Sequence, residues 1–251
     1  MSLPAQVHAA LSAVAEAPRL LVATDFDGVL APFVLDPMDS RAQPGTLEAL
    51  DALARAPLTW AAVVSGRDLA TLDQLTGLAG SPVTRIGSHG AESSRGSVVP
   101  EGASRDLQLL VEQVERAVAA RDPRVRLERK PTAIALHTRG LPEDAAEAAA
   151  EIAAEAARNE GVTQLSGKGV HELSVLRADK GTALRELAHL LQVDATVYLG
   201  DDVTDEHAFE VLGERDLGIK VGSGETAATA RVADSSLVPQ VLEALAQLRG
   251  S

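Results

Sequence analysis

The chain has 251 residues, a formal net charge of −13 and no cysteine. The acidic balance argues against binding to nucleic-acid backbones, which requires clustered Lys and Arg, and the absence of Cys excludes disulfides, thiolate metal sites and cysteine nucleophiles. No run approaches the ~18 to 20 apolar residues that span a bilayer, and the first 21 residues lack a signal-peptide pattern, so we expect a soluble cytoplasmic protein without a membrane partner.

Short apolar runs that end in acidic or small polar residues alternate with helical patterns along most of the chain. The runs are Leu20–Ala23 before Asp25, Trp60–Val64 before Ser65, and Thr196–Leu199 before Asp201. This βαβ rhythm predicts an α/β fold with a Rossmann-like, doubly wound parallel sheet. Ligands of such sheets bind at the carboxyl ends of the strands, so we expect the three polar ends to converge on one site.

The middle of the chain has a different pattern, which predicts a small α/β unit of its own. One helical pattern carries Leu107, Leu110, Val111, Val114 and Val118, and an Ala-rich one covers residues 143–158. Residues 124–129 and 132–138 indicate one strand pair, and residues 163–165 and 170–175 a second. We therefore predict a cap domain of residues 96–176, inserted into a larger domain of residues 1–95 and 177–251.

Two candidate motifs follow the first two strands. In the first motif, Asp25 to Gly28, a glycine turn can bring the two carboxylates into one pocket, although a solvated acidic turn explains the same letters. The second motif, Ser65-Gly66-Arg67, offers a hydroxyl and backbone N–H groups suited to phosphate oxygens. An ordinary turn with a helix cap is the alternative reading of the second motif.

Two further motifs lie near the carboxyl-terminal end. Lys180, at the start of a predicted helix, is able to stabilise charge on carboxylates and a phosphoryl group, although a solvated lysine is the simpler reading. The segment Gly200 to Glu206 carries four acidic residues within six positions. Such a cluster favours a hard cation, best matched by Mg²⁺, although acidic residues also stabilise a helix N-terminus.

Taken in order, these four motifs resemble those of haloacid dehalogenase superfamily phosphatases. Within that superfamily the chain resembles the trehalose-6-phosphate phosphatase family: Gly87 to Glu92 matches its G-x-H-G-x-E signature, Glu128 to Arg139 its E-x-K and H-Y-R stretches, and Gly200 to Glu206 its G-D-D-x-T-D-E. Gly167-Lys168, Glu172-Leu173 and Lys180-Gly181 follow the same pattern. Thr138, Ser174 and Val175 depart from it.

The resemblance implies a hydrolase core and a substrate-specificity cap that together cleave a sugar phosphate with Mg²⁺. Asp25 would attack phosphorus and form an aspartyl-phosphate, Asp27 would act as acid and base, and Ser65 and Lys180 would hold the phosphoryl charge. The implied metal residues are Asp25, Asp27 through its carbonyl, Asp201, Asp202 and Asp205. The implied substrate-binding residues are Gly66, Arg67, His89, Glu92, Lys130, His137, Arg139, Lys168 and Glu172.

Several alternatives stay open at this point. His137 also fits an exposed strand-end histidine, Lys168 a solvated turn and Glu92 a solvated loop. The substrate could instead be sucrose 6-phosphate or mannosyl- or glucosyl-3-phosphoglycerate. A phosphomutase is a weaker alternative, and a non-catalytic sugar-phosphate-binding regulator has no need for the full set of acids and Lys180. The sequence does not give the oligomeric state.

Overall fold

The computed structural model describes residues 3–34, 36–96, 103–130, 133–159, 161–167, 169–175 and 179–250. The chain divides into two compact units, which are described separately: Met1–Ser97 with Ala178–Ser251, called unit 1, and Val98–Arg177, called unit 2. Among the described residues, no helix combines the length and apolar character that crossing a bilayer requires.

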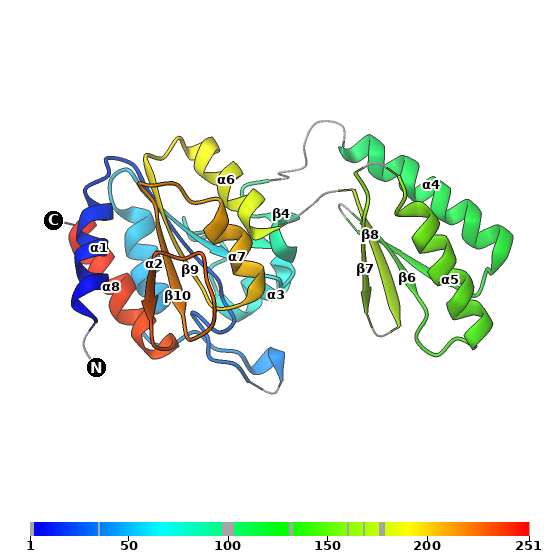
Figure 1. The fold of residues 1–251 in the computed structure, drawn as a ribbon, viewed down its shortest axis with the longest axis horizontal. Coiled ribbons are helices and arrows are strands. Elements are labelled where there is room, and N and C mark those ends of the chain that lie inside the picture. The colour runs from blue at the N-terminus through cyan, green and yellow to red at the C-terminus, as the bar shows by residue number, and fades with distance from the viewer. Residues whose placement is uncertain are drawn as a thin grey trace. The chain divides into compact units, whose positions relative to one another are not determined.

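Unit 1 is built on a seven-stranded sheet of order β11-β10-β9-β1-β2-β3-β4 (Figure 1). All neighbouring strands are parallel except β4, which runs antiparallel to β3. The predicted α/β parallel sheet is therefore confirmed. The strands are β1 (Leu20–Thr24), β2 (Thr59–Val64), β3 (Thr84–Gly87), β4 (Glu92–Ser93), β9 (Ala195–Gly200), β10 (Leu217–Val221) and β11 (Ala230–Val232).

Helices cover both faces of this sheet because alternate residues of each central strand are buried on opposite sides. Leu20 and Val22 of β1 pack in a cluster with α1, α2 and α8, whereas Leu21 and Ala23 pack in a second cluster with α6 and α7. The helices of unit 1 are α1 (Ala5–Ala15), α2 (Thr46–Arg55), α3 (Leu69–Thr76), α6 (Lys180–Leu191), α7 (Val203–Glu210) and α8 (Val238–Arg249), with single 3₁₀ turns at Pro37–Asp39, Ser88–Gly90 and Ser235–Leu237.

Unit 2 is a four-stranded antiparallel sheet of order β5-β6-β8-β7 with two helices packed on one face. Figure 1 shows α4 and α5 side by side against these strands. The bounds are α4 (Ala103–Arg121), β5 (Arg126–Arg129), β6 (Ala133–His137), α5 (Glu143–Ala156), β7 (Thr163–Gly167) and β8 (Val170–Ser174). The two helices and both strand pairs predicted in this region are confirmed. The pairing of β6 with β8, which joins the two hairpins into one sheet, is an additional finding.

Candidate active site

The carboxyl ends of β1 and β9 bring the acidic motifs of unit 1 together. These strands are hydrogen-bonded neighbours in parallel register, with Thr24 opposite Leu199, and the amide of Asp25 donates to the carbonyl of Leu199 at 2.9 Å. Carboxylate oxygens of Asp25, Asp201 and Asp205 all lie within 4.8 Å of one another. The convergence of strand ends that the sequence predicts is therefore present for the first and last motifs.

Asp25 is a buried carboxylate held from two sides. Its Oδ1 accepts from the amide of Phe26 at 2.6 Å, and its Oδ2 lies 2.8 Å from Lys180 Nζ. Burial raises the pKa of Asp25 to about 7, with the field of Asp205 adding to the rise and Lys180 opposing it. The group therefore needs cationic neighbours to stay ionised at neutral pH.

Lys180 supplies one such neighbour and is itself enclosed. Its ammonium nitrogen lies 2.8 Å from Asp25 and 2.8 Å from Asp205. Burial lowers the pKa of Lys180, but the two carboxylates outweigh that effect and raise it above its ordinary value. Asp179 caps α6 by accepting from the amide of Thr182 at 2.8 Å, which fixes the helix end that carries the lysine.

Asp205 orients this cluster. Its Oδ1 accepts from Lys180 Nζ at 2.8 Å and from the Tyr198 hydroxyl at 2.7 Å, and its Oδ2 accepts from the amides of Asp201 and Asp202, both at 2.9 Å. Four donors satisfy both oxygens of this buried carboxylate. Asp205 therefore fixes the positions of Lys180 and the Asp201–Asp202 backbone rather than offering free lone pairs.

Asp201 has the opposite character. Its Oδ1 is buried and has no hydrogen-bond partner among the described residues, and burial, followed by the field of Asp205, raises the pKa of Asp201 to about 6. A Cβ at Gly28, whose φ is +79°, would lie 2.1 Å from Asp201 Oδ2. Glycine is therefore required at position 28 for the close approach of the first motif to the last. The buried Asp201 Oδ1, which has no partner among the described residues, would be stabilised by a positively charged group.

Asp202 plays a local structural part in this geometry. Its side chain is exposed and accepts from the amide of Val203 at 2.7 Å, and with Asp205 it forms the capping box of α7. It is not a member of the carboxylate cluster formed by Asp25, Asp201 and Asp205.

Asp27 is bonded to Arg67 rather than to Asp25. The guanidinium donates from Nε to Oδ2 at 2.6 Å and from Nη2 to Oδ1 at 2.7 Å, and the Ser40 hydroxyl donates to Oδ1 at 3.0 Å. The same guanidinium lies over the ring of Phe26, 5.7 Å from its centroid. The first and second motifs are therefore linked by a bidentate ion pair, and the pKa of Arg67 is raised by it.

The Ser65-Gly66 turn lies close to His89. Ser65 is buried, its hydroxyl accepts from the amide of Arg67 at 3.2 Å, and its carbonyl accepts from the amide of His89 at 2.9 Å. A Cβ at Gly66 would lie 2.6 Å from the imidazole of His89. His89 has a φ of +56°, and burial followed by the charge of Lys180 lowers the pKa of its ring. Its imidazole is thus placed over the turn as a neutral group.

Glu92 has internal partners. One oxygen accepts from the Ser88 hydroxyl and the other from the amide of Leu69 at 3.2 Å, at the beginning of α3. The Glu92 carboxylate therefore connects the 3₁₀ turn that carries His89 to the helix after Arg67, and it fixes these two segments relative to each other.

The remaining predicted residues belong to unit 2 or lie outside the described residues. Lys130 and Glu172 form an ion pair, and His137 Nε2 lies 2.7 Å from Glu128. By register, Glu128 and Glu172 flank Ala135 on the sheet face opposite that of Ile134 and Leu173, which pack on the helices. Arg139 follows the end of β6 and is exposed. Lys168 lies outside the described residues.

Two residues of the unit 1 site were not predicted. Tyr198 is the only tyrosine of the chain and lies in a buried strand. A buried tyrosine hydroxyl requires a hydrogen-bond partner, so its position just before the acidic loop could have indicated a contact with one of the acids, which proves to be Asp205. Ser40 is buried beside Asp27 but lies in a segment without a motif, and only the folded chain reveals it.

Comparison with known proteins gives consistent matches. The model of the family described as trehalose-phosphatase matches residues 23–238. Trehalose-phosphate phosphatase of Mycobacterium marinum is 34% identical over 224 residues, covering 83% of this chain and 55% of the relative, and that of Mycobacterium bovis is 35% identical over 247 residues, covering 90% and 61%. The chain thus spans between half and two thirds of these relatives' lengths.

A solved structure shares the fold over nearly the whole chain. The trehalose-6-phosphate phosphatase of Aspergillus fumigatus has a TM-score of 0.68 at 22% identity, with 98% of this chain and 100% of that chain covered. At that identity the likeness concerns the fold alone.

Proposed function

Because this chain belongs to the trehalose-phosphatase family, we propose that it hydrolyses trehalose 6-phosphate to trehalose and phosphate through an aspartyl-phosphate intermediate. The observation that supports this most is the buried cluster of Asp25, Lys180, Asp201 and Asp205 at the carboxyl ends of β1 and β9. In this proposal unit 1 carries the chemistry, and unit 2 is the cap that selects the sugar.

Asp25 is the proposed nucleophile. Its oxygen attacks phosphorus, the bond from phosphorus to the sugar oxygen breaks, and water then attacks the acyl-phosphate and restores the carboxylate. Lys180, 2.8 Å from Asp25 Oδ2, offsets the negative charge that gathers as nucleophile and phosphoryl group approach. Phosphate monoesters are among the slowest esters to hydrolyse unaided, so this electrostatic support has to combine with orientation and proton transfer.

Asp27 is the proposed acid and base. It would protonate the leaving sugar oxygen and later accept a proton from water, as a two-step path requires. Its present bonds to Arg67 and Ser40 hold the carboxylate away from that task. We propose that a phosphoryl group bound near Ser65 competes for Arg67, which frees Asp27 as the substrate arrives.

The residues of the cluster fit Mg²⁺. All nearby ligands are oxygens, and the buried Oδ1 of Asp201 has no partner among the described residues. Asp25, Asp201 and the carbonyl of Asp27 would hold the ion, with Asp205 and Asp202 fixing the surrounding backbone. The ion supplies charge neutralisation and orientation of the phosphoryl oxygens. Lys180, itself held by Asp205, contacts Asp25 and fixes its position, and Asp205 also holds the backbone of Asp201. Gly28 leaves the space that the Asp201 side chain occupies.

Sugar recognition is proposed for unit 2. Lys130 and Glu172 pair on the sheet face that the helices leave uncovered, and together they offer a donor and an acceptor to sugar hydroxyls. His89 and the Ser65-Gly66 turn would contact the phosphate end of the ester. The assignments of His137, Arg139 and Lys168 stay predictions.

Phosphate release tests the proposal directly. The purified protein is incubated with trehalose 6-phosphate, sucrose 6-phosphate, glucose 6-phosphate and mannosyl-3-phosphoglycerate, with and without Mg²⁺. Magnesium-dependent preference for trehalose 6-phosphate, abolished by Asp25→Asn in a folded protein, is the expected result. Preference for another ester would refute the sugar assignment and keep the mechanism. No release from any ester would favour a non-catalytic regulator.

A further inference from the structure

Ser40 is a buried serine that belongs to none of the sequence motifs, yet its hydroxyl contacts two side chains of the unit 1 site. The hydroxyl donates to Asp27 Oδ1 at 3.0 Å and accepts from Arg67 Nη2 at 3.3 Å. Ser40 is 1% exposed, whereas the Asp27 side chain is 29% exposed. The hydroxyl is therefore covered, while the carboxylate that it contacts stays accessible to a ligand.

The backbone around Ser40 fixes the direction from which the hydroxyl approaches Asp27. The amide of Ser40 donates to the carbonyl of Pro37 at 3.4 Å, and its carbonyl accepts from the guanidinium of Arg41 at 2.7 Å. Three residues later, the amide of Gln43 donates to the carbonyl of Leu30 at 2.8 Å. The segment is therefore bonded on both sides of the serine, and the hydroxyl has a fixed place beside the carboxylate.

The two oxygens of Asp27 have different partners. Arg67 binds both of them, through Nε to Oδ2 at 2.6 Å and through Nη2 to Oδ1 at 2.7 Å, whereas Ser40 binds Oδ1 alone. If a phosphoryl group draws Arg67 away, as proposed above, both guanidinium bonds are lost and the Ser40 bond remains. Oδ1 then keeps a donor, and Oδ2 has none among the described residues.

The Ser40 hydroxyl has one hydrogen to donate, and Asp27 Oδ1 is its only acceptor among the described residues. A buried hydroxyl without an acceptor is costly, so the hydrogen stays on the side of Oδ1. An oxygen that accepts from a hydroxyl is the carbonyl-like oxygen of a carboxylic acid. The other oxygen, Oδ2, is then the one that carries the acid proton.

We propose that Ser40 is a positioning residue for the proposed hydrolysis, because it keeps Asp27 Oδ1 as an acceptor and leaves Oδ2 to transfer the proton. In the first step the bond from phosphorus to the sugar oxygen breaks, its electron pair stays on that oxygen, and the proton of Oδ2 moves to it. In the second step a water oxygen bonds to phosphorus, the bond to Asp25 breaks, and Oδ2 takes the proton that water loses. The inference rests on the proposed function, and Ser40 itself touches no reacting atom.

Two esters with different leaving groups test the inference, because only one of them needs the proton. A sugar oxygen has to be protonated as it leaves, whereas p-nitrophenolate leaves as a stable anion. The esters are p-nitrophenyl phosphate and the sugar phosphate that the parent protein hydrolyses fastest, both with Mg²⁺. Single-turnover measurements with the protein in excess isolate the first step. They give a rate at saturation and a half-saturating protein concentration for each ester.

Ser40→Ala should slow only the cleavage of the sugar ester. The rate at saturation should fall at least about tenfold, as part of the roughly hundredfold or more that a positioned proton donor contributes. The rate with p-nitrophenyl phosphate and both half-saturating concentrations should stay within about twofold of the parent values. Ser40→Cys fills nearly the same space with a weak donor and should show the same selective loss. Full cleavage of p-nitrophenyl phosphate would show that the variants fold.

Ser81→Ala is the matched control. The Ser81 hydroxyl donates to Asp51 Oδ1 at 2.9 Å, and Arg55 binds the same carboxylate through Nε at 2.6 Å. This group repeats the bonding around Asp27 but contains none of the residues of the proposed site. Ser81→Ala should therefore cleave both esters at the parent rates.

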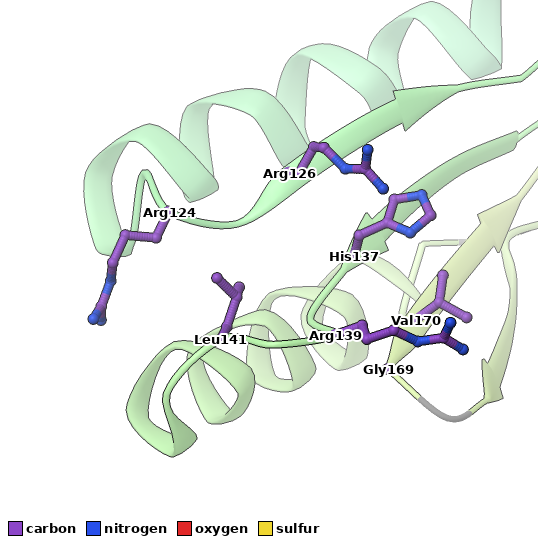
Figure 2. Close-up of a pocket in the computed structure, with 7 residues that line it drawn as sticks. All are labelled: Arg124, Arg126, His137, Arg139, Leu141, Gly169 and Val170. Atoms are coloured by element: carbon purple, nitrogen blue, oxygen red, sulfur yellow. The ribbon is translucent and has the colours of Figure 1, made fainter.

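A defect in sugar binding would also spare p-nitrophenyl phosphate, but it would change the half-saturating concentration instead of the rate at saturation. Arg139→Gln provides this comparison. Figure 2 shows Arg139 in a pocket of unit 2 that Arg126 and His137 also line. Under the proposed function, in which unit 2 selects the sugar, this variant should raise the half-saturating concentration for the sugar ester.

Three results with an active parent protein would overturn the inference. An equal loss of rate with both esters would mean that Ser40 supports the architecture of the site rather than the proton transfer. Parent rates of Ser40→Ala and Ser40→Cys with the sugar ester would mean that the bond is dispensable. A change in the half-saturating concentration alone would make Ser40 a substrate contact. A parent protein that cleaves neither ester would refute the proposed hydrolysis, and with it the inference, which is a result distinct from these three.

Discussion

The ammonium group of Lys180 lies 2.8 Å from the carboxylate of Asp25, and both side chains are almost completely buried. Asp205 is the second carboxylate on the same ammonium group. One positive charge thus faces two negative charges where little water reaches, and the Tyr198 hydroxyl and backbone amides add hydrogen bonds to Asp205. With Asp201 counted as well, the ionised cluster has an excess of negative charge, which a divalent cation near Asp25 and Asp201 would neutralise.

Replacing Lys180 by Met should abolish phosphate release and destabilise the protein. Two buried carboxylates lose their charge partner, which costs about 3–5 kcal/mol when a buried pair is broken. Denaturant unfolding at pH 8 measures the loss. The loss should shrink towards pH 5, because a carboxyl group without Lys180 takes up a proton more readily in the folded chain than in the unfolded chain.

Lys220→Met is the matched control for that variant. Lys220 is also buried, but its partner Glu206, 2.9 Å away, is partly exposed and accepts from Thr226 and the amide of Ala227 as well. A smaller destabilisation is expected. Equal stability of Lys180→Met and the parent protein at pH 8 would contradict the arrangement.

Tyr198→Phe should lower the free energy of unfolding by about 0.5–1.5 kcal/mol, the usual worth of one hydrogen bond. The ring stays packed edge-on against Phe209, 5.6 Å away, and Asp205 keeps its three other donors. Thermal and denaturant unfolding measure the change. Phosphate release should fall less than in Lys180→Met, and a loss as large as that of the lysine variant would mean that the hydroxyl has a part in the reaction itself.

Gly28→Ala should abolish tight cation binding while the fold persists. The new methyl group would lie 2.1 Å from Asp201 Oδ2, so Asp201 has to move. Gly80→Ala provides the control, since Gly80 has a similar φ of +83° and no atom within 4 Å of its would-be Cβ. Both variants carry the backbone strain of about 1 kcal/mol or more. Isothermal titration with Mg²⁺ should separate them, and equal affinities would refute the site.

Cation affinity should rise with pH. A cation requires ionised Asp25 and Asp201, whose pKa values are raised to about 7 and about 6, so protons compete with it below those values. The apparent dissociation constant should fall at least about a hundredfold from about pH 5 to about pH 8 and then level off. Titrations of the parent protein with Mg²⁺ or Mn²⁺ at several pH values measure this, and a flat profile would contradict it.

The sequence predicts the elements that local patterns encode. Apolar runs before Asp25, Ser65 and Asp201 appear as β1, β2 and β9, because buried parallel strands are apolar along their whole length. The alternation in residues 124–138 likewise corresponds to β5 and β6. The position of Asp25 beside Asp201 follows from the general rule that strand ends in a parallel sheet share one edge.

Contacts between distant segments are what the sequence could not predict. The bonds from Arg67 and Ser40 to Asp27 join three loops, and no spacing rule connects them. Glu92 looked available for a ligand, yet it is bonded to Ser88 and the amide of Leu69. Such partners depend on how loops close over one another, which involves tertiary packing rather than periodicity.

Within the described part of the chain, unit 2 contributes no strand to the sheet of unit 1, since the chain leaves after β4 and returns before α6. Lys180 lies directly after that return, yet it is anchored by the Asp179 cap and by Gly181, where even a Cβ would lie 2.1 Å from the carbonyl of His207. Under the proposed function, changes in unit 2 can alter which ester is accepted while the groups that break the phosphorus–oxygen bond are inherited intact.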